Sequence, residues 1–560
     1  GLDLRKKTWL GVLPLAGVDM EKLPPLVRST DCVGGLTRRG FVFSCDVSGL
    51  NPGGYVLGVS LAETNKPAIP LGEAPFRVAA PGTPGPTPAA RVSLFYDNAV
   101  EGLEGDWTYA FGLLLPPHAL YAPDRVRVTD RDGKPLPTQA REIMRWRPGG
   151  AIKLMQVLFQ APPPKEKTAV MRLLGRESND RFAPFRVEYG TRVEPAPVDK
   201  PIRVREEGDS IVVDTGALRG TIGKRDGFFS LLELDANGNG TYEAGERVLG
   251  PGAAQALTAV DQNGTVYIGR ALAGDAGTVI EQAGPVEVVL RTRGHYADKT
   301  GRSVSEYRMR LRFARQSRDI RIEHTWVMSG DANAIQFQDI AFDLPLAGLG
   351  PDRTVVLDTP DDPIGTPVYT ERLGARSRLS LLQDLYHHHG RVGAHAGIYA
   401  DPAGRGATVM RRTMARAGHW MEVQGAAGGV LAAIRDLWQQ FPKELELDGD
   451  RLRLHLYSSR TVEQESPVRF GRRLLDFRNE SWLAWWGDRF LRGVAGGELP
   501  GWTAMYQNAR GIARTHELLL HWYGNADPET ARRARGREFQ TPVLTLVQPD
   551  HTCSADPHDQ

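Results

Sequence analysis

Two short runs in the second half of the chain combine residue types that could do acid–base chemistry on a sugar. Residues 435–443 read Arg-Asp-Leu-Trp-Gln-Gln-Phe-Pro-Lys and follow an apolar strand predicted over 428–434. The second run, 511–517, reads Gly-Ile-Ala-Arg-Thr-His-Glu. Because alternate residues of a strand share a face, Arg514 and His516 are predicted to point one way and Glu517 the other. Together the runs supply the charge, hydrogen-bonding groups and aromatic surface that carbohydrate sites use.

These residue types suit β-elimination from a uronate. The reaction needs a cation to neutralise the C6 carboxylate, a base for the C5 proton and an acid for the leaving oxygen. Arg514 and Lys443 are the predicted carboxylate binders, and His516 and Arg435 are predicted catalytic residues. Two structural alternatives stay open: Arg514 and His516 as a buried polar pair, and Arg435 with Asp436 as an ion network.

Residues 386–389 form a histidine cluster and read Tyr-His-His-His. On a strand, His387 and His389 would share one face, with His388 opposite. Tyr386 and His388 are predicted to take part in catalysis. Zinc would need three or four converging nitrogen or sulfur ligands, and nothing nearby in the sequence completes such a set. A polar loop without a catalytic role is the alternative.

Residues 235–246 match the calcium-loop template D-x-[DN]-x-[DN]-G-x5-E. Calcium takes six to eight oxygen ligands, and this segment offers most of them at the template positions. The predicted ligands are Asp235, Asn237, Asn239, Thr241 through its carbonyl, and Glu246. We expect a structural Ca²⁺ in a β domain, and the alternative is an Asn-Gly turn with solvated acids.

Tryptophan is the remaining candidate for sugar contact. Trp438, Trp482, Trp485 and Trp486 could stack on pyranose faces, although tryptophans also fill β-sandwich cores. The sequence has no Gly-rich phosphate loop, GxSxG elbow or HExxH motif, and no organic cofactor is predicted. Hydrolysis by a pair of carboxylates stays open.

The elements that must position these residues are predicted to be mainly β, with little helix until the C-terminus. Residues 1–80 indicate an immunoglobulin-like β module, and 81–90 a Pro-rich linker. Residues 91–345 favour a β-barrel-like domain and 346–545 a central β-sandwich, because short strands recur with turn residues between them. A helix is predicted to open at Pro528, and 546–560 is interpreted as a junction.

The runs 435–443 and 514–517 resemble those of the exo-rhamnogalacturonan lyase family, polysaccharide lyase family 26. Residues 380–384 and 212–218 add weaker support, and the resemblance covers roughly 91–560. It implies an N-terminal β-barrel and a central β-sandwich, followed by an α/α-toroid that would begin near Gln560. It also implies β-elimination on an acidic polysaccharide that contains rhamnose and uronate.

Composition excludes some partners. With 69 basic and 67 acidic residues the net charge is +2, so no large field favours nucleic acid. No apolar run approaches the ~20 residues that span a bilayer. The resemblance to the lyase family implies an acidic polysaccharide as the partner, and an oligomer or larger assembly is compatible with the sequence.

Cysteine spacing indicates the compartment. Cys32 and Cys45 bracket a short loop that a disulfide could close, which suits an exported domain, whereas two free thiols are the alternative. Cys553 has no obvious partner. We expect a secreted or cell-surface protein. The alternative function is a non-catalytic glycan-binding or surface structural protein built from the same β domains.

Overall fold

The computed structural model divides the chain into two compact units, residues 1–86 and 87–560. It describes the backbone of five strands between residues 9 and 78, and then residues 89–163, 183–332, 334–360, 367–384, 396–463, 466–476, 510–548 and 551–552. The division between the units lies inside the predicted Pro-rich linker. Cys32, Cys45 and Cys553 lie outside the described residues.

The first unit contains antiparallel strands. β1 (Trp9–Pro14) pairs with β4 (Gly53–Leu61), which pairs with β5 (Ile69–Val78). β2 (Val33–Thr37) and β3 (Gly40–Ser44) form a separate hairpin. An immunoglobulin-like topology for this unit stays a prediction.

The second unit begins with a small β region that has its own core. Its sheets have the orders β36-β6-β12-β8-β9 and β10-β11-β7, so the C-terminal strand β36 returns to pair with β6. Tyr96, Tyr109, Phe159 and Phe185 contact one another in this core through tilted and edge-to-face ring pairs. The strands are β6 (Ala90–Tyr96), β7 (Trp107–Leu114), β8 (Val126–Asp130), β9 (Pro135–Leu136), β10 (Thr138–Arg145), β11 (Ile152–Ala161), β12 (Phe185–Tyr189) and β36 (Thr545–Val547).

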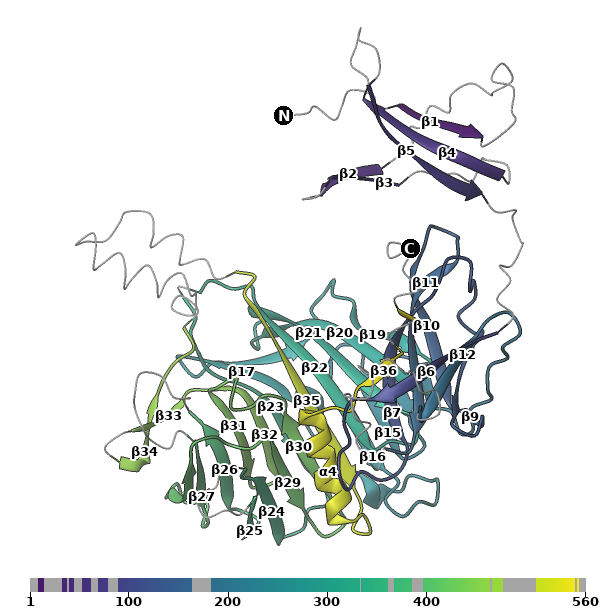
Figure 1. Ribbon diagram of the computed structural model, residues 1–560. Coiled ribbons are helices and arrows are strands. Elements are labelled where there is room, and N and C mark those ends of the chain that lie inside the picture. Colours follow the sequence, from purple (N-terminus) through teal and green to yellow (C-terminus); the bar gives the residue numbers. More distant parts are fainter. Residues whose placement is uncertain are drawn as a thin grey trace, which may run out of the picture. The chain divides into compact units, whose positions relative to one another are not determined.

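A four-stranded antiparallel sheet and a large sandwich follow (Figure 1). The four strands are β13 (Arg203–Glu207), β14 (Ser210–Asp214), β15 (Leu218–Gly223) and β16 (Phe229–Leu234). Two 3₁₀ turns, η3 (Ala244–Glu246) and η4 (Ala253–Gln255), connect this sheet to the sandwich.

The sandwich consists of two runs of neighbouring strands that we name sheet A and sheet B. Sheet A has the order β19-β20-β21-β22-β35-β30-β29-β24-β25, and sheet B the order β17-β23-β32-β31-β26-β27-β28. β18 pairs with both β17 and β20 and joins the two. Their apolar side chains form one core, for example Leu518 and Leu520 from sheet A with Leu445 and Leu454 from sheet B.

The strands of sheet A are β19 (Gly277–Ala283), β20 (Glu287–Ala297), β21 (Ser303–Ala314), β22 (Asp319–Met328), β24 (Arg353–Asp358), β25 (Val368–Leu373), β29 (Trp420–Gln424), β30 (Gly429–Ile434) and β35 (Ala513–Tyr523). Those of sheet B are β17 (Leu257–Asp261), β23 (Phe337–Pro345), β26 (Arg378–Gln383), β27 (Ala396–Asp401), β28 (Val409–Met414), β31 (Lys443–Asp448) and β32 (Arg451–Ser458). β18 covers Val266–Arg270, and β33 (Arg460–Glu463) and β34 (Ser466–Arg472) form a hairpin.

The helix α4 (Glu529–Gln540) packs on the outer face of sheet A over β30 and β35. Phe539 joins Trp420, Leu431 and Leu519 in a small apolar cluster there. Gly536 permits the close approach, because a Cβ at that position would lie 2.7 Å from the Trp420 ring. The prediction of a mainly β chain with little helix before the C-terminus is confirmed. In the described part of the chain, none of the helices has the length and apolar character needed to cross a membrane.

Candidate functional site

The predicted site residues of the 435–443 run fall into two groups. Arg435 forms an ion pair with Glu517 (Nε–Oε2 2.8 Å), and its guanidinium lies 4.7 Å from the centre of the Phe539 ring. It therefore ties the loop after β30 to β35 and α4 on the outer face of sheet A. Trp438 is half-buried, and the Arg416 guanidinium lies 5.1 Å from its ring.

Lys443 and His516 lie on the core-facing side of the sandwich. His516 lies on the same face of β35 as the core residues Leu518 and Leu520, and Lys443 lies on the same face of β31 as Leu445. The Nδ1 of His516 is 3.0 Å from Gln440 Oε1, and the Nζ of Lys443 donates to the carbonyl of Leu456. Their exposures are 4% and 0%.

Burial lowers the pKa of both groups. For Lys443, desolvation and the charge of Arg514 hold the pKa well below its usual value. For His516, desolvation acts together with Lys443, His324 and Arg514 in the same direction. The imidazole of His516 is therefore uncharged at neutral pH, while Arg514 is exposed and charged. The structure thus brings together the buried bases Lys443 and His516, and we name these two residues the buried basic cluster. Gln440 contacts His516, and the exposed Arg514 lies nearby.

Tyr386, His388, Trp482, Trp485 and Trp486 lie outside the described residues. β26 ends at Gln383, which pairs with Lys443, so the predicted histidine cluster follows in sequence from a strand next to β31.

The predicted calcium loop is compact. The Asp235 carboxylate accepts hydrogen bonds from the backbone N–H groups of Asn239 (3.0 Å) and Gly240 (2.9 Å). The Glu246 carboxylate accepts from the backbone of Ala236 (2.9 Å) and Glu243 (3.0 Å). The first and last acids of the template thus both bond to backbone N–H groups of this loop. Calcium binding stays a prediction.

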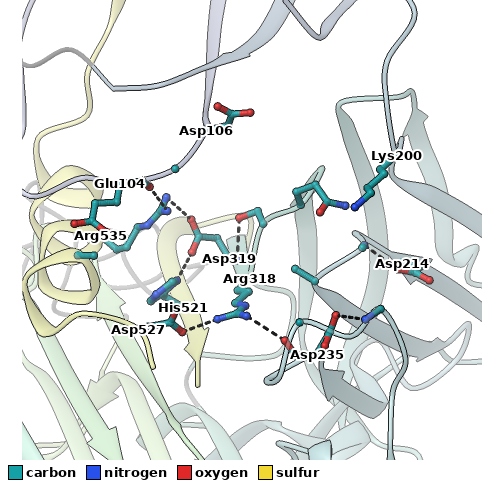
Figure 2. A pocket seen from close by; sticks show the side chains of 18 of the residues that line it. Glu104, Asp106, Lys200, Asp214, Asp235, Arg318, Asp319, His521, Asp527 and Arg535 are labelled. Carbon is teal, nitrogen blue, oxygen red and sulfur yellow. Dashed lines mark hydrogen bonds and ion pairs between the residues drawn. The ribbon is translucent and has the colours of Figure 1, made fainter. Parts of the chain in front are cut away.

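This loop forms one wall of a cavity of about 660 Å³ (Figure 2). The other walls come from the β14–β15 and β21–β22 turns, the end of β35, the segment that leads into α4 with its first turns, and residues 104–106 and 200–203. The charged or titratable lining residues are Glu104, Asp106, Lys200, Arg203, Asp214, Asp235, Tyr242, Arg318, Asp319, His521, Asp527, Arg532 and Arg535.

At the base of the cavity, His521 is held by a buried carboxylate. Its Nδ1 is 2.6 Å from Asp319 Oδ1, and the exposures of the two residues are 8% and 7%. Burial acts to raise the pKa of Asp319, but Arg535 (3.6 Å from Oδ2) and His521 outweigh it and hold the pKa below its usual range. The ionised Asp319 favours a proton on Nδ1, which leaves a lone pair on Nε2 when the ring is neutral.

The Nε2 atom of His521 has no hydrogen-bond partner within the described ranges, and His521 lines the cavity. An imidazole oriented by a carboxylate through one nitrogen and open to a cavity through the other can act as a general base and then as an acid.

Arg318 connects the cavity walls. It forms an ion pair with Asp527 at the start of α4 (2.5 Å) and donates to the carbonyl of Asp235 (3.1 Å), as Figure 2 shows. The loop 235–246, the β21–β22 turn and α4 are therefore held together by one guanidinium.

Two cations, Lys200 and Arg203, also line the cavity and are exposed. Neither has an ion pair or side-chain hydrogen bond to another part of the chain that the structure describes. In Figure 2 the Lys200 side chain extends into the space between Asp106 and Asp214. The Asp214 carboxylate accepts a hydrogen bond from the hydroxyl of Tyr242 (2.9 Å). The cavity therefore holds two exposed cations beside an oriented imidazole, in a lining that also contains six carboxylates.

Sequence reasoning selected His516 and missed His521, five positions further along the same strand. His521 lies on the opposite face, since Leu520 and Trp522 belong to the sandwich core. Its partner Asp319 is 202 positions away in the sequence. Because an odd number of positions separates His521 from His516, the sequence could have shown that the two rings lie on different faces of the strand.

Comparison with known proteins gives one family match. Residues 202–372 match the model of the PcRGLX-like protein central beta sandwich domain, a rhamnogalacturonan-lyase-related domain. The matched stretch includes Arg203, Asp214, Asp235, Arg318 and Asp319 of the cavity. This supports the resemblance to rhamnogalacturonan lyases at the level of the domain. No curated protein matches the chain.

Solved structures match over most of this chain at low similarity. A glycosyl hydrolase family 38 protein from Enterococcus faecalis is 10% identical with a TM-score of 0.43, and the match covers 82% of this chain and 48% of that one. An α-mannosidase from Enterococcus faecalis V583 is 11% identical with a TM-score of 0.36, covering 83% and 46%. A TPR-domain containing protein from Parabacteroides distasonis is 9% identical with a TM-score of 0.27, covering 57% and 48%. The chain thus spans about half the length of each.

Proposed function

We propose that this protein cleaves an acidic polysaccharide containing rhamnose and uronate by β-elimination, and that the cavity around His521 is the active site. The observation that carries the proposal is the Asp319–His521 pair, whose open imidazole edge faces a cavity that also holds Lys200 and Arg203. The domain match over 202–372 supports the substrate class.

Each step of the reaction has a group in the cavity. Lys200 and Arg203 neutralise the C6 carboxylate, which makes the C5 proton more acidic. The His521 Nε2 takes that proton, the electron pair forms the C4–C5 double bond, and the bond from C4 to the leaving oxygen breaks. The imidazolium then returns its proton to the leaving oxygen. Asp319 is a positioning residue that holds the ring and stabilises its charged form.

We also propose that loop 235–246 binds a structural Ca²⁺ through Asp235, Asn237, Asn239, the Thr241 carbonyl and Glu246. Oxygen atoms are the ligands that Ca²⁺ prefers, and the loop has the template order. Because Arg318 donates to the Asp235 carbonyl, a metal ion in this loop would stiffen one wall of the cavity. The proposed substrate is an extracellular polymer, so the protein is proposed to act outside the cell or at its surface.

The test is the ultraviolet absorbance of unsaturated uronate during incubation with rhamnogalacturonan and other acidic polysaccharides. The wild-type chain is compared with His521→Ala and, as a matched control on the same strand, His516→Ala. We expect product from the wild type, a loss of about a hundredfold or more in His521→Ala, and a small change in His516→Ala.

Loss in His516→Ala alone, with normal folding, would move the active site to the buried basic cluster that the sequence predicted. An absence of product on every acidic glycan, with binding retained, would support the non-catalytic glycan-binding alternative instead. Circular dichroism and the melting temperature of each variant separate loss of folding from loss of chemistry.

A further inference from the structure

Arg535 of α4 contacts the Asp319–His521 pair, and the proposed mechanism gives it no role. Its Nη1 lies 3.6 Å from Asp319 Oδ2, while the Nδ1 of His521 lies 2.6 Å from Oδ1 of the same carboxylate. Figure 2 shows the Arg535 guanidinium between Glu104 and Asp319. One buried carboxylate is therefore shared between an imidazole and a guanidinium.

Two contacts with the small β region hold the guanidinium in place. The Nη2 of Arg535 donates to the carbonyl of Glu104 (3.0 Å), and its guanidinium carbon lies 4.3 Å from the centre of the Trp107 ring. Trp107 begins β7 and is buried, so its ring is a fixed surface. A planar guanidinium can stack on an aromatic face and still donate from its edges. These contacts set the position of the cation relative to Asp319.

The other arginines around the pair have carboxylates of their own. Their ion pairs are Arg318–Asp527, Arg321–Glu538 and Arg532–Glu422. The remaining charged groups that line the cavity are Glu104, Asp106, Lys200, Arg203, Asp214 and Asp235. Among the residues that the structure describes, Asp319 is the one carboxylate with which Arg535 forms an ion pair.

The shared carboxylate has a consequence for proton transfer. A carboxylate favours the protonated form of a neighbouring imidazole, and a nearby cation disfavours it. Asp319 thus orients the His521 ring, while Arg535 offsets part of the attraction of Asp319 for a proton on that ring. A general base must be unprotonated at the working pH to accept a proton from its substrate.

We propose that Arg535 is a positioning residue that keeps His521 unprotonated before the first proton transfer. It acts through Asp319, and its contacts with Glu104 and Trp107 link this action to the packing of the small β region against α4. The inference rests on the proposed function, since that function makes His521 the base. The protonation of the ring, however, can be measured without turnover.

The test uses diethyl pyrocarbonate, which acylates an imidazole only in its unprotonated form. The rate of modification of His521 in the intact chain is followed by peptide mass spectrometry over about pH 5 to 8, the range in which histidine titrates. The midpoint of this curve is the pH at which the ring loses its proton. In Arg535→Gln we expect the midpoint to rise by about half a unit to one unit, because Asp319 then acts on His521 alone. Arg535→Lys keeps the charge and should stay close to the wild-type midpoint.

Arg537→Gln is the matched control. Arg537 lies two positions further along α4, donates to the carbonyl of Glu101 (2.9 Å) and forms no ion pair with Asp319 in the described structure. Its loss removes a similar hydrogen bond from the same segment and should leave the midpoint unchanged. If Arg535→Gln does not fold, Arg535→Met keeps a long side chain against Trp107 without the charge. An unchanged midpoint in a folded, uncharged variant overturns the proposal, and so does an equal shift in Arg537→Gln.

Activity gives a second readout. On an acidic polysaccharide, the acidic limb of kcat/KM against pH should move upward in Arg535→Gln by the same amount as the midpoint. A limb that stays in place while the midpoint moves would overturn the role of Arg535 in proton transfer. A wild-type chain that forms no unsaturated product would overturn the elimination mechanism, and the modification midpoints would still decide whether Arg535 controls the protonation of His521.

Discussion

His516 and His521 lie on the same strand, β35, but in opposite surroundings. His516 faces the sandwich core, contacts the amide of Gln440 and has the basic residues Lys443 and Arg514 as neighbours. His521 faces a cavity and is held by the buried carboxylate of Asp319. The same side chain is therefore kept neutral by burial in one place and given an orienting anion in the other. The partner and the strand face, more than the residue type, decide what chemistry is available.

The contrast between His516 and His521 is tested by removing the group that orients each ring. Asp319→Asn should lower kcat on an acidic polysaccharide by about a hundredfold or more, because an amide cannot stabilise the imidazolium and favours the wrong tautomer. Gln440→Leu removes the partner of His516 and should change kcat by less than about twofold. Initial rates of unsaturated-uronate formation measure both.

Folding of each variant is checked by its melting temperature. The reverse ranking, with Gln440→Leu inactive and Asp319→Asn active, would assign the chemistry to the buried basic cluster.

The pH dependence of the free energy of unfolding provides a second test of the contrast between the core and the cavity. The pKa of His324, the cross-strand neighbour of His516, is lowered by burial to about 3. An unfolded histidine binds a proton near pH 6.5, so the stability that this neutral ring contributes is present above that pH and is lost as the pH falls toward 3. Asp319 behaves differently, since its lowered pKa leaves its contribution intact until the pH falls below about 4.

We therefore expect the free energy of unfolding to drop by about 2 kcal/mol between pH 7 and pH 5 from His324 alone. Lys443 and His516 act in the same direction. Urea unfolding at several pH values measures the slope, and His324→Gln should flatten it. A slope that stays the same in His324→Gln would contradict a neutral buried ring.

How much of this could be read from the sequence depends on how each strand alternates. β21 alternates buried and less buried residues along most of its length, and the alternation of apolar and polar residues over 307–313 predicts such a strand. The end of β35 does not alternate, because Leu519 packs under α4 while Leu518 and Leu520 fill the core. A strand covered on both faces gives no sign of which residues share a side, and this is why His521 was overlooked.

The cavity was beyond sequence reasoning for a different reason. Its walls come from segments as far apart as Glu104 and Arg535, and the link between Asp319 and His521 exists only after β22 and β35 pair. Gln440 and Lys443 of the 435–443 run lie close to His516 of the 511–517 run. They meet on the core side of the sandwich, and the alternative of a buried polar role for His516 had allowed for this burial.

The cations of the cavity provide a smaller test. Lys200→Gln and Arg203→Gln should each lower kcat/KM about tenfold, because each removes one charged contact to the substrate carboxylate. Lys224→Gln is the matched control, since Lys224 is paired with Glu206 (2.7 Å) and does not line the cavity. Equal effects of all three substitutions would indicate a general loss of positive charge and would remove Lys200 and Arg203 from the site.

Removal of calcium should give the smallest effect, and it should act on the cavity but not on the core around His324. At a Ca²⁺ concentration about ten times its Kd, binding adds about 1.4 kcal/mol of stability, so EDTA should lower the melting temperature by roughly 2 °C. Asp235→Asn should abolish the difference between Ca²⁺ and EDTA, whereas Asp226→Asn, outside the loop, should retain it. Since Arg318 links the loop to the cavity, EDTA should also reduce turnover, while the acid-stability slope set by His324 should not change. A melting temperature that is identical with and without Ca²⁺ in the wild type would show that the loop is held by its own hydrogen bonds, with Asp235 and Glu246 bonded to backbone N–H groups only.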